Sequence, residues 1–245
     1  MRLDKLLVEM QIGSRSEVKK YIKNGLVTVD GTNKVKPEQQ IDPFEQKITF
    51  KGKEITYQEY EYYMLYKPAD CVTARTDALH KTVMEYIESK RKDLSPVGRL
   101  DIDTEGLLLI TNDGKLSHNL LSPTKHVKKV YEADIEGCVT KEDCFAFANG
   151  LDIGDDTLTK PAELEIIESG EFSKIRITIT EGRYHQVKRM FQAVGKKVVF
   201  LKRLEMGSLC LDKDLKPGEY RSLTKQEIMN LQEDDYAYEH KRRNF

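Results

Sequence analysis

The sequence of 245 residues contains no tryptophan and only four cysteines, none of which forms a Cys-x-x-Cys pair. A chain of this length can bury a core without covalent cross-links. The spacing therefore excludes a small disulfide-stapled fold, and the cysteines are expected to be reduced thiols. The five histidines are scattered and lack metal-ligand spacing, so no metal site is predicted.

Long apolar runs and an excess of either charge are also missing. No segment approaches the ~20 apolar residues of a membrane-spanning helix, and the N-terminus lacks the apolar stretch of a secretion signal. With 40 basic and 41 acidic residues the net charge is −1, which excludes a uniformly basic coat for nucleic acid but not local basic patches. A soluble, cytoplasmic protein with no membrane partner is expected. No repeat or heptad pattern argues for a dimer, so a monomer is expected.

Residues 1–53 are predicted to form a small unit of their own. Apolar residues at helical spacing indicate a helix near the N-terminus, and Ser14 and Ser16 can cap a second one. Two short strands are predicted at 26–29 and 47–50, and an Asp-Gly turn follows the first. The predicted order is helix, helix, hairpin.

This small unit has eleven basic and seven acidic residues, a net charge of +4. Arg15, Lys19 and Lys23 recur every four residues, so they share one face of the second predicted helix. A solvated helix face would show the same pattern. The local excess of positive charge favours a phosphate-binding face instead.

The rest of the chain is predicted to form a larger domain. Residues 54–60 are polar and aperiodic and are predicted to be a linker, 61–232 the domain, and 233–245 a charged tail that frays. Strands are predicted at 62–66, 106–111, 130–135, 162–167 and 174–180, and helices at 83–92, 116–121, 141–149 and 185–194. Because helices and strands interleave irregularly, the predicted class is α+β with a mixed or antiparallel sheet.

The run Gly-Arg-Leu-Asp-Ile-Asp-Thr-Glu-Gly at 98–106 places Asp101 beside Arg99, directly before an apolar strand. Folding has no need of a carboxylate there, so Asp101 is a candidate nucleophile or base. A lone aspartate in a turn is more often structural, and Asp103 is interpreted as such a turn or capping residue.

Two further segments have unusual chemistry. Residues 128–133 contain Tyr131 beside two lysines, and Glu-Gly-Arg-Tyr-His-Gln-Val-Lys-Arg-Met-Phe at 181–191 opens a predicted helix. Seven basic residues and no acidic one lie between Arg183 and Arg203. Such a run repels itself unless a polyanion binds. Aromatic rings among the cations could stack on bases. The candidate RNA contacts are Arg183, Tyr184, His185, Gln186 and Arg189.

The segments at 2–7, 14–18 and 25–31 resemble the S4-type RNA-binding domain. The segments at 98–104, 158–162, 181–191 and 217–221 resemble the pseudouridine synthases, in the branch that carries such a domain and acts on the small ribosomal subunit. The resemblance implies an S4-type module of two helices followed by a pseudouridine synthase catalytic domain. It adds Arg2 and Lys5 to the basic residues expected to contact RNA.

The resemblance also implies a reaction, in which uracil leaves C1′ of its ribose, rotates and rejoins through C5 without any cofactor. The aspartate of the family corresponds to Asp101, which would attack C1′ or act as a base at C2′. Its basic partner corresponds to Lys188, with Arg99 as the local alternative. The family tyrosine corresponds to Tyr131, expected to stack on the flipped base and assist proton transfer. The implied partner is ribosomal RNA or a small-subunit assembly particle, and the implied target is uridine 516 of the small-subunit RNA.

Two alternatives remain. One is a synthase of the same branch that modifies large-subunit RNA. The other is a non-catalytic assembly factor that binds ribosomal RNA through the same surfaces. The set of Asp101, Tyr131 and Lys188 favours an enzyme, because a carboxylate among phosphates would only weaken binding by a pure RNA binder.

Overall fold

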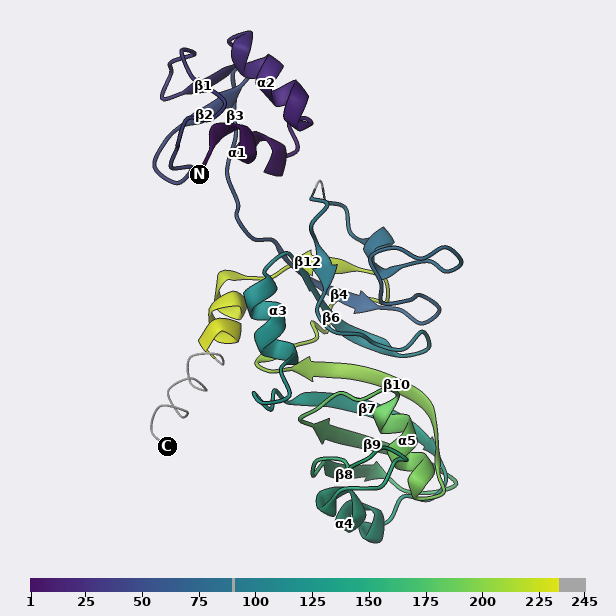
Figure 1. The fold of residues 1–245 in the computed structure, drawn as a ribbon. Coiled ribbons are helices and arrows are strands. Elements are labelled where there is room, and N and C mark those ends of the chain that lie inside the picture. The colour runs from purple at the N-terminus through teal and green to yellow at the C-terminus, as the bar shows by residue number, and fades with distance from the viewer. Residues whose placement is uncertain (90, 234–245) are drawn as a thin grey trace, which may run out of the picture. The chain divides into compact units, whose positions relative to one another are not determined.

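The computed structural model describes residues 1–89 and 91–233, which divide into two compact units (Figure 1). The first comprises residues 1–60 with 88–89 and 91–94, and the second comprises 61–87 with the described residues from 95 onward. Apart from Glu233, the tail predicted at 233–245 lies outside the described residues. No helix of the described part is both long and apolar enough to span a membrane.

The first unit packs two helices on a three-stranded antiparallel sheet. Its elements are α1 (Leu3–Glu9), α2 (Arg15–Lys23), β1 (Val27–Val29), β2 (Ile48–Phe50) and β3 (Lys53–Glu54), with strand order β1-β2-β3. Ser14 caps α2, because its hydroxyl accepts the Glu17 N–H while the Glu17 carboxylate accepts the Ser14 N–H at 2.8 Å. The apolar stripe of α2 then buries Val18 and Ile22 against the sheet side of the unit.

The predicted Asp-Gly turn is present in this unit. Asp30 and Gly31 both have positive φ, 50° and 81°. The strands on 27–29 and 48–50 pair antiparallel as expected, but the long segment 30–47 joins them, and the turn is only its beginning. Residues 54–60 lie within the small unit, where Ile55 and Tyr57 pack on its core.

The second unit is built on a nine-stranded mixed sheet with the order β12-β4-β6-β10-β7-β9-β8, with β5 beside β6 and β11 beside β10. Among the described strands, β6 and β10 pair parallel and the other pairs are antiparallel. This arrangement confirms the predicted α+β class. The strands are β4 (Tyr62–Lys67), β5 (Ser95–Pro96), β6 (Glu105–Thr111), β7 (Lys129–Glu136), β8 (Glu163–Glu168), β9 (Phe172–Ile179), β10 (Lys197–Met206), β11 (Leu209–Cys210) and β12 (Tyr220–Ser222).

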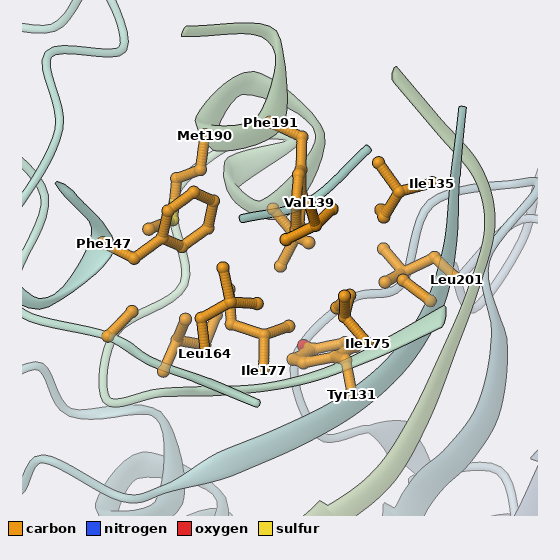
Figure 2. Close-up of a cluster of buried hydrophobic side chains, with 14 of the residues drawn as sticks. Tyr131, Ile135, Val139, Phe147, Leu164, Ile175, Ile177, Met190, Phe191 and Leu201 are labelled. Atoms are coloured by element: carbon orange, nitrogen blue, oxygen red, sulfur yellow. The ribbon is translucent and has the colours of Figure 1, made fainter. Parts of the chain in front are cut away.

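Helices cover parts of this sheet. They are η1 (Val83–Tyr86, a 3-10 turn), α3 (Gly114–Leu121), α4 (Lys141–Asn149) and α5 (Gln186–Ala193), and residues 225–233 are also helical. α5 packs on β10 and α4 on β8 (Figure 1). Figure 2 shows Met190 and Phe191 of α5 facing Phe147 of α4 above the strand residues Ile175 and Ile177. Each fully buried side chain of this kind contributes about 1.5–3 kcal/mol. This cluster therefore anchors α5 on the sheet.

One predicted element is wrong, and one strand was not predicted. The helix predicted at 83–92 is a single 3-10 turn at 83–86, and residues 87–89 are not helical. The ten-residue strand at 197–206 was not predicted, although it lies in the middle of the sheet between β6 and β7.

The parallel pair β6–β10 depends on Gly106. Its φ is 103°, and a Cβ at this position would lie 2.2 Å from the backbone oxygen of Arg203. Only glycine allows the two backbones to approach so closely. The turn at 98–104 is thereby held next to β10.

Candidate active site

The three segments with unusual chemistry meet at one cavity of about 640 Å³ in the second unit. Asp101, Tyr131 and Lys188, the candidate catalytic residues, all line it. So do five of the predicted RNA contacts, which are Arg99, Arg183, Tyr184, His185 and Gln186. The structure therefore brings together candidate residues that lie up to 89 positions apart, between Arg99 and Lys188.

Asp101 lies in a turn whose backbone is bound by the side chain of Lys67. The Lys67 side chain is fully buried, and its ammonium donates to the carbonyl oxygens of Pro68 at 3.0 Å, Ile102 at 3.3 Å and Thr104 at 2.8 Å. Burial lowers the pKa of Lys67, and the nearby Cys71 and the acidic residues oppose this shift. Lys67-Pro68 resembles a Lys-Pro element of the family, but Lys67 was not predicted as a site residue, because its contacts are to backbone atoms of the folded chain.

The Asp101 carboxylate has two basic neighbours at the start of α5. Its oxygens lie 3.5 Å from Lys188 Nζ and 3.4 Å from His185 Nε2. Arg99, the local alternative partner, is exposed and forms no ion pair with Asp101 within the described part. Of the two proposed partners, the geometry favours Lys188.

Lys188 is shared with a second carboxylate. Its Nζ lies 2.6 Å from Asp103, closer than to Asp101. Burial alone would raise the pKa of Asp103, but the hydrogen bond and the charge of Lys188 lower it below its ordinary value. Asp103 was predicted to be a turn residue only. The structure adds that it competes with Asp101 for the lysine.

The rim of the cavity carries a flat pair of rings. The Tyr184 and His185 rings stack with centroids 3.8 Å apart, and Tyr184 is 76% exposed. His185 has φ 48°, a left-handed conformation that non-glycine residues adopt at some cost. Gln186 braces this turn, since its side chain accepts the Arg183 N–H and donates to Glu181, both at 2.9 Å. The buried Gln186 thus supports the rim rather than presenting an exposed donor.

Two predicted RNA contacts make many contacts within the unit. The Arg183 guanidinium donates to the carbonyl oxygens of Thr157 and Leu158, each at 2.7 Å. Arg189 donates to the Ile153 carbonyl and forms an ion pair with Asp155. Both arginines bind the segment 153–158. Several of their N–H groups therefore already have acceptors within the unit.

Tyr131 forms part of the cavity wall from the sheet. It lies on β7 opposite Ile177 of β9 and Arg203 of β10, and it is 8% exposed. Two further cations, Lys129 and Arg203, line the same wall. Burial, and then the charges of Arg203 and Lys160, lower the pKa of Lys129 to about 8. Neither residue was predicted as a site residue. The two-residue spacing of Lys129 from Tyr131 on one strand was the signal that could have identified it.

This arrangement suits chemistry on a nucleoside. A partly exposed carboxylate with a lysine partner can attack a sugar carbon or remove a proton, and an aromatic ring in the same cavity can hold a base. The described residues contain no cluster of three acidic, histidine or cysteine side chains that could hold a metal ion.

The small unit offers a separate basic surface. Arg15, Lys19 and Lys23 on α2 are exposed and form no ion pair among the described residues. By contrast, Arg2 is paired with Asp4 at 2.7 Å and Lys5 with Glu9 at 3.6 Å. Arg15, Lys19 and Lys23 therefore remain candidates for phosphate contacts, whereas Arg2 and Lys5 already have acidic partners.

Comparison with protein families decides the kind of enzyme. Residues 61–193, more than half of the chain, match the family model described as RNA pseudouridylate synthase. The chain belongs to this family. It is an isomerase that acts on RNA, which confirms the predicted activity. Residues 1–46 match the S4 domain, which confirms the predicted class of the small unit.

Relatives of this pseudouridine synthase match along both units. An uncharacterised RNA pseudouridine synthase, YtzG of Bacillus subtilis (strain 168), is 46% identical over 237 residues, which cover 95% of this chain and 99% of the relative. Ribosomal small subunit pseudouridine synthase A of Escherichia coli (strain K12) is 42% identical over 234 residues, 94% of this chain and 100% of the relative. A crystal structure of a pseudouridylate synthase superposes with a TM-score of 0.67 and 39% identity, covering 94% of this chain and 99% of that one.

Proposed function

We propose that this enzyme converts one uridine of small-subunit ribosomal RNA to pseudouridine, and that the target corresponds to uridine 516. The observation that carries the proposal is the match to a ribosomal small subunit pseudouridine synthase A along 94% of this chain and the whole of the relative. Because that match includes the small basic unit, it concerns substrate choice as well as chemistry. The enzyme would act in the cytoplasm on ribosomal RNA or an assembling small subunit.

Asp101 is assigned to the sugar, as the nucleophile at C1′ or the base at C2′. Its support is the position in the cavity wall, where the Lys188 ammonium lies 3.5 Å from the Asp101 carboxylate. Tyr131 is assigned to the base, because its ring lies in the same wall. Taking a uridine out of its stack costs a few kcal/mol, and stacking of ~1–3 kcal/mol on a ring offsets much of this cost.

The S4-type unit is assigned to RNA binding through Arg15, Lys19 and Lys23. These cations are exposed on one face of α2 and lack acidic partners in the described structure. Phosphate neutralisation supplies affinity without sequence information. The choice of the uridine would then depend on the cavity and its rim.

The test is a map of pseudouridines in ribosomal RNA from cells that lack the gene, and from the same cells supplied with wild type, Asp101→Asn or Asp103→Asn. Wild type is expected to restore one small-subunit site, and Asp101→Asn to leave it unmodified. Asp103→Asn is the matched control, since it removes the exposed carboxylate that shares Lys188. It is expected to restore the site.

Each other outcome has a distinct meaning. Loss of a large-subunit site in the deletion strain would replace the proposed substrate by the large-subunit alternative. Restoration by Asp101→Asn would overturn the role of Asp101 and leave the substrate standing. If no ribosomal uridine changes on deletion, ribosomal RNA is not the substrate.

A further inference from the structure

The cavity wall contains buried polar atoms that have no partner. Among the residues that the structure describes, two buried side-chain atoms lack a hydrogen bond, Arg203 Nη2 and the Thr104 hydroxyl. Both residues line the cavity. An unsatisfied buried donor costs about 1–3 kcal/mol, and more when it is charged. Because both residues line the same cavity, a ligand bound there is a natural partner for these atoms.

Arg203 is held in place on the wall. It is 3% exposed, and its Nε donates to the Leu107 carbonyl at 2.8 Å. Its register partner on β7 is Tyr131, and Leu201 lies two residues before it on β10. Side chains at these positions share one face of a sheet. The Arg203 side chain therefore leaves the sheet on the same face as the Tyr131 ring that is expected to hold the base, and both residues line the cavity.

The charge of this wall is positive. No ion pair of the described structure involves Arg203, and Lys129 lies on the same face of the neighbouring strand. The positive charge of Arg203 disfavours the protonated form of Lys129, which contributes to the lowered pKa of Lys129. Such a wall favours a ligand that carries or develops negative charge.

The reaction develops negative charge on the base. When the C1′–N1 bond breaks, its electron pair leaves with uracil and spreads over N1, O2 and O4. The base then turns about the axis through N3 and C6, which exchanges the places of O2 and O4. The C5–C1′ bond forms, the C5 proton leaves, and N1 takes up a proton. A donor placed at O4 of the bound uridine thus meets a carbonyl oxygen when the C1′–N1 bond breaks and, after the rotation, meets the other carbonyl oxygen when the C5–C1′ bond forms.

We propose that Arg203 is a catalytic residue that donates a hydrogen bond to the uracil carbonyl at O4 and stabilises the detached uracil anion, an inference that rests on the proposed isomerisation. The same contact selects uracil, because cytosine presents an amino group in place of this oxygen. Arg203 thereby distinguishes uracil from cytosine, while Asp101 acts on the sugar.

The test uses the full-length enzyme and RNA fragments that contain the mapped target as uridine or as 4-thiouridine, with tritium at C5. Release of tritium in a single turnover measures the rate. Sulfur accepts hydrogen bonds weakly, so wild type is expected to react ~10-fold more slowly with the thio base. Arg203→Met is expected to react with uridine on the order of 100-fold more slowly than wild type, as for removal of one preorganised donor. It is also expected to react with uridine and 4-thiouridine at similar rates.

Lys202→Met is the matched control, because it removes a cation from the adjacent position of β10. Its Nζ lies 4.8 Å from the centre of the Tyr66 ring, and it does not line the cavity. This variant is expected to keep the wild-type ratio between the two bases. Should Arg203→Met fail to fold, Arg203→Lys keeps the charge without the planar fork, and a reduced ratio is expected.

If the role of Arg203 were purely structural, its replacement would slow the reactions of uridine and 4-thiouridine by the same factor. An unchanged ratio in a folded Arg203 variant would therefore overturn the inference and leave the isomerase function intact. A wild-type enzyme that releases no tritium from uridine in any ribosomal fragment would instead overturn the proposed substrate, and this inference with it.

Discussion

At the scale of single residues, Lys67 links the fold to the candidate nucleophile. Its ammonium is enclosed by three carbonyl oxygens, of which those of Ile102 and Thr104 belong to the turn that begins at Asp101. The Thr73 hydroxyl adds a bond to the Leu100 carbonyl at 2.7 Å. The turn is thus fastened on both sides of Asp101, so the carboxylate is held in a fixed position.

Replacement of Lys67 by Met is expected to lower the free energy of unfolding by about 3 kcal/mol or more. It removes three hydrogen bonds from a charged donor and leaves buried carbonyl oxygens without a partner. Urea denaturation measures the change. Lys81→Met is the control, because Lys81 is exposed and its ammonium only lies over the Tyr86 ring, 3.8 Å from its centre. A Lys67 variant within 0.5 kcal/mol of wild type would contradict this role.

Some residues of the site could be predicted from the sequence and others could not. Asp101 was identifiable because a charge directly before an apolar strand has no folding reason. The roles of Lys67 and Arg203 were not, since the burial of a cation and its contacts are known only from the fold. The shared use of Lys188 by two carboxylates also depends on where α5 begins in space.

At the scale of elements, α2 has an apolar stripe toward the core of the small unit and a basic face toward solvent. Changing Arg15, Lys19 and Lys23 to Ala is expected to weaken RNA binding and flatten its dependence on salt. Each lost phosphate contact lowers the slope of log affinity against log salt by about 0.7–0.9. Titration of labelled ribosomal RNA at several salt concentrations measures this slope.

The control for α2 removes three cations from elsewhere on the same unit. Lys34, Lys36 and Lys53 are equally exposed, so their replacement by Ala lowers the charge of the unit by the same amount. If both triple variants change the slope alike, binding depends on total charge and the α2 face has no special role.

The central strand β10 escaped prediction for a structural reason. Its pairing with β7 has register shifts between Val198 and Phe200 and between Arg203 and Glu205. Each shift interrupts the two-residue alternation by which a half-buried strand is recognised. The strand on 172–179 has no such interruption against β7, and it was predicted within two residues.

At the scale of the whole molecule, the two-part organisation follows from a change in composition, but the sheet order does not. The parallel pair β6–β10 joins residues almost one hundred positions apart, Gly106 and Arg203. Such pairing leaves no local pattern in a sequence. The segments of the site could therefore be named in advance, whereas their distances and the cationic wall required the fold.

The buried Lys129 couples the stability of the folded molecule to pH. Burial and the charges of Arg203 and Lys160 lower its pKa from 10.5 to about 8. Between these values the unfolded chain still binds a proton that the folded chain has lost, so the free energy of unfolding rises with pH. Below about pH 8 both states are protonated, and the contribution no longer changes.

The measurement is the urea midpoint of wild type and of Lys129→Met from pH 7 to about 10. The difference between wild type and variant is expected to shift in favour of wild type above about pH 8. Burial raises the pKa of the Cys71 thiol and lowers that of Lys67, but both groups are common to the two proteins and cancel. For Lys128→Met, at the exposed neighbouring position, the curve of urea midpoint against pH is expected to be parallel to that of wild type. Parallel curves for Lys129→Met as well would show that Lys129 titrates in the folded state as it does in the unfolded chain.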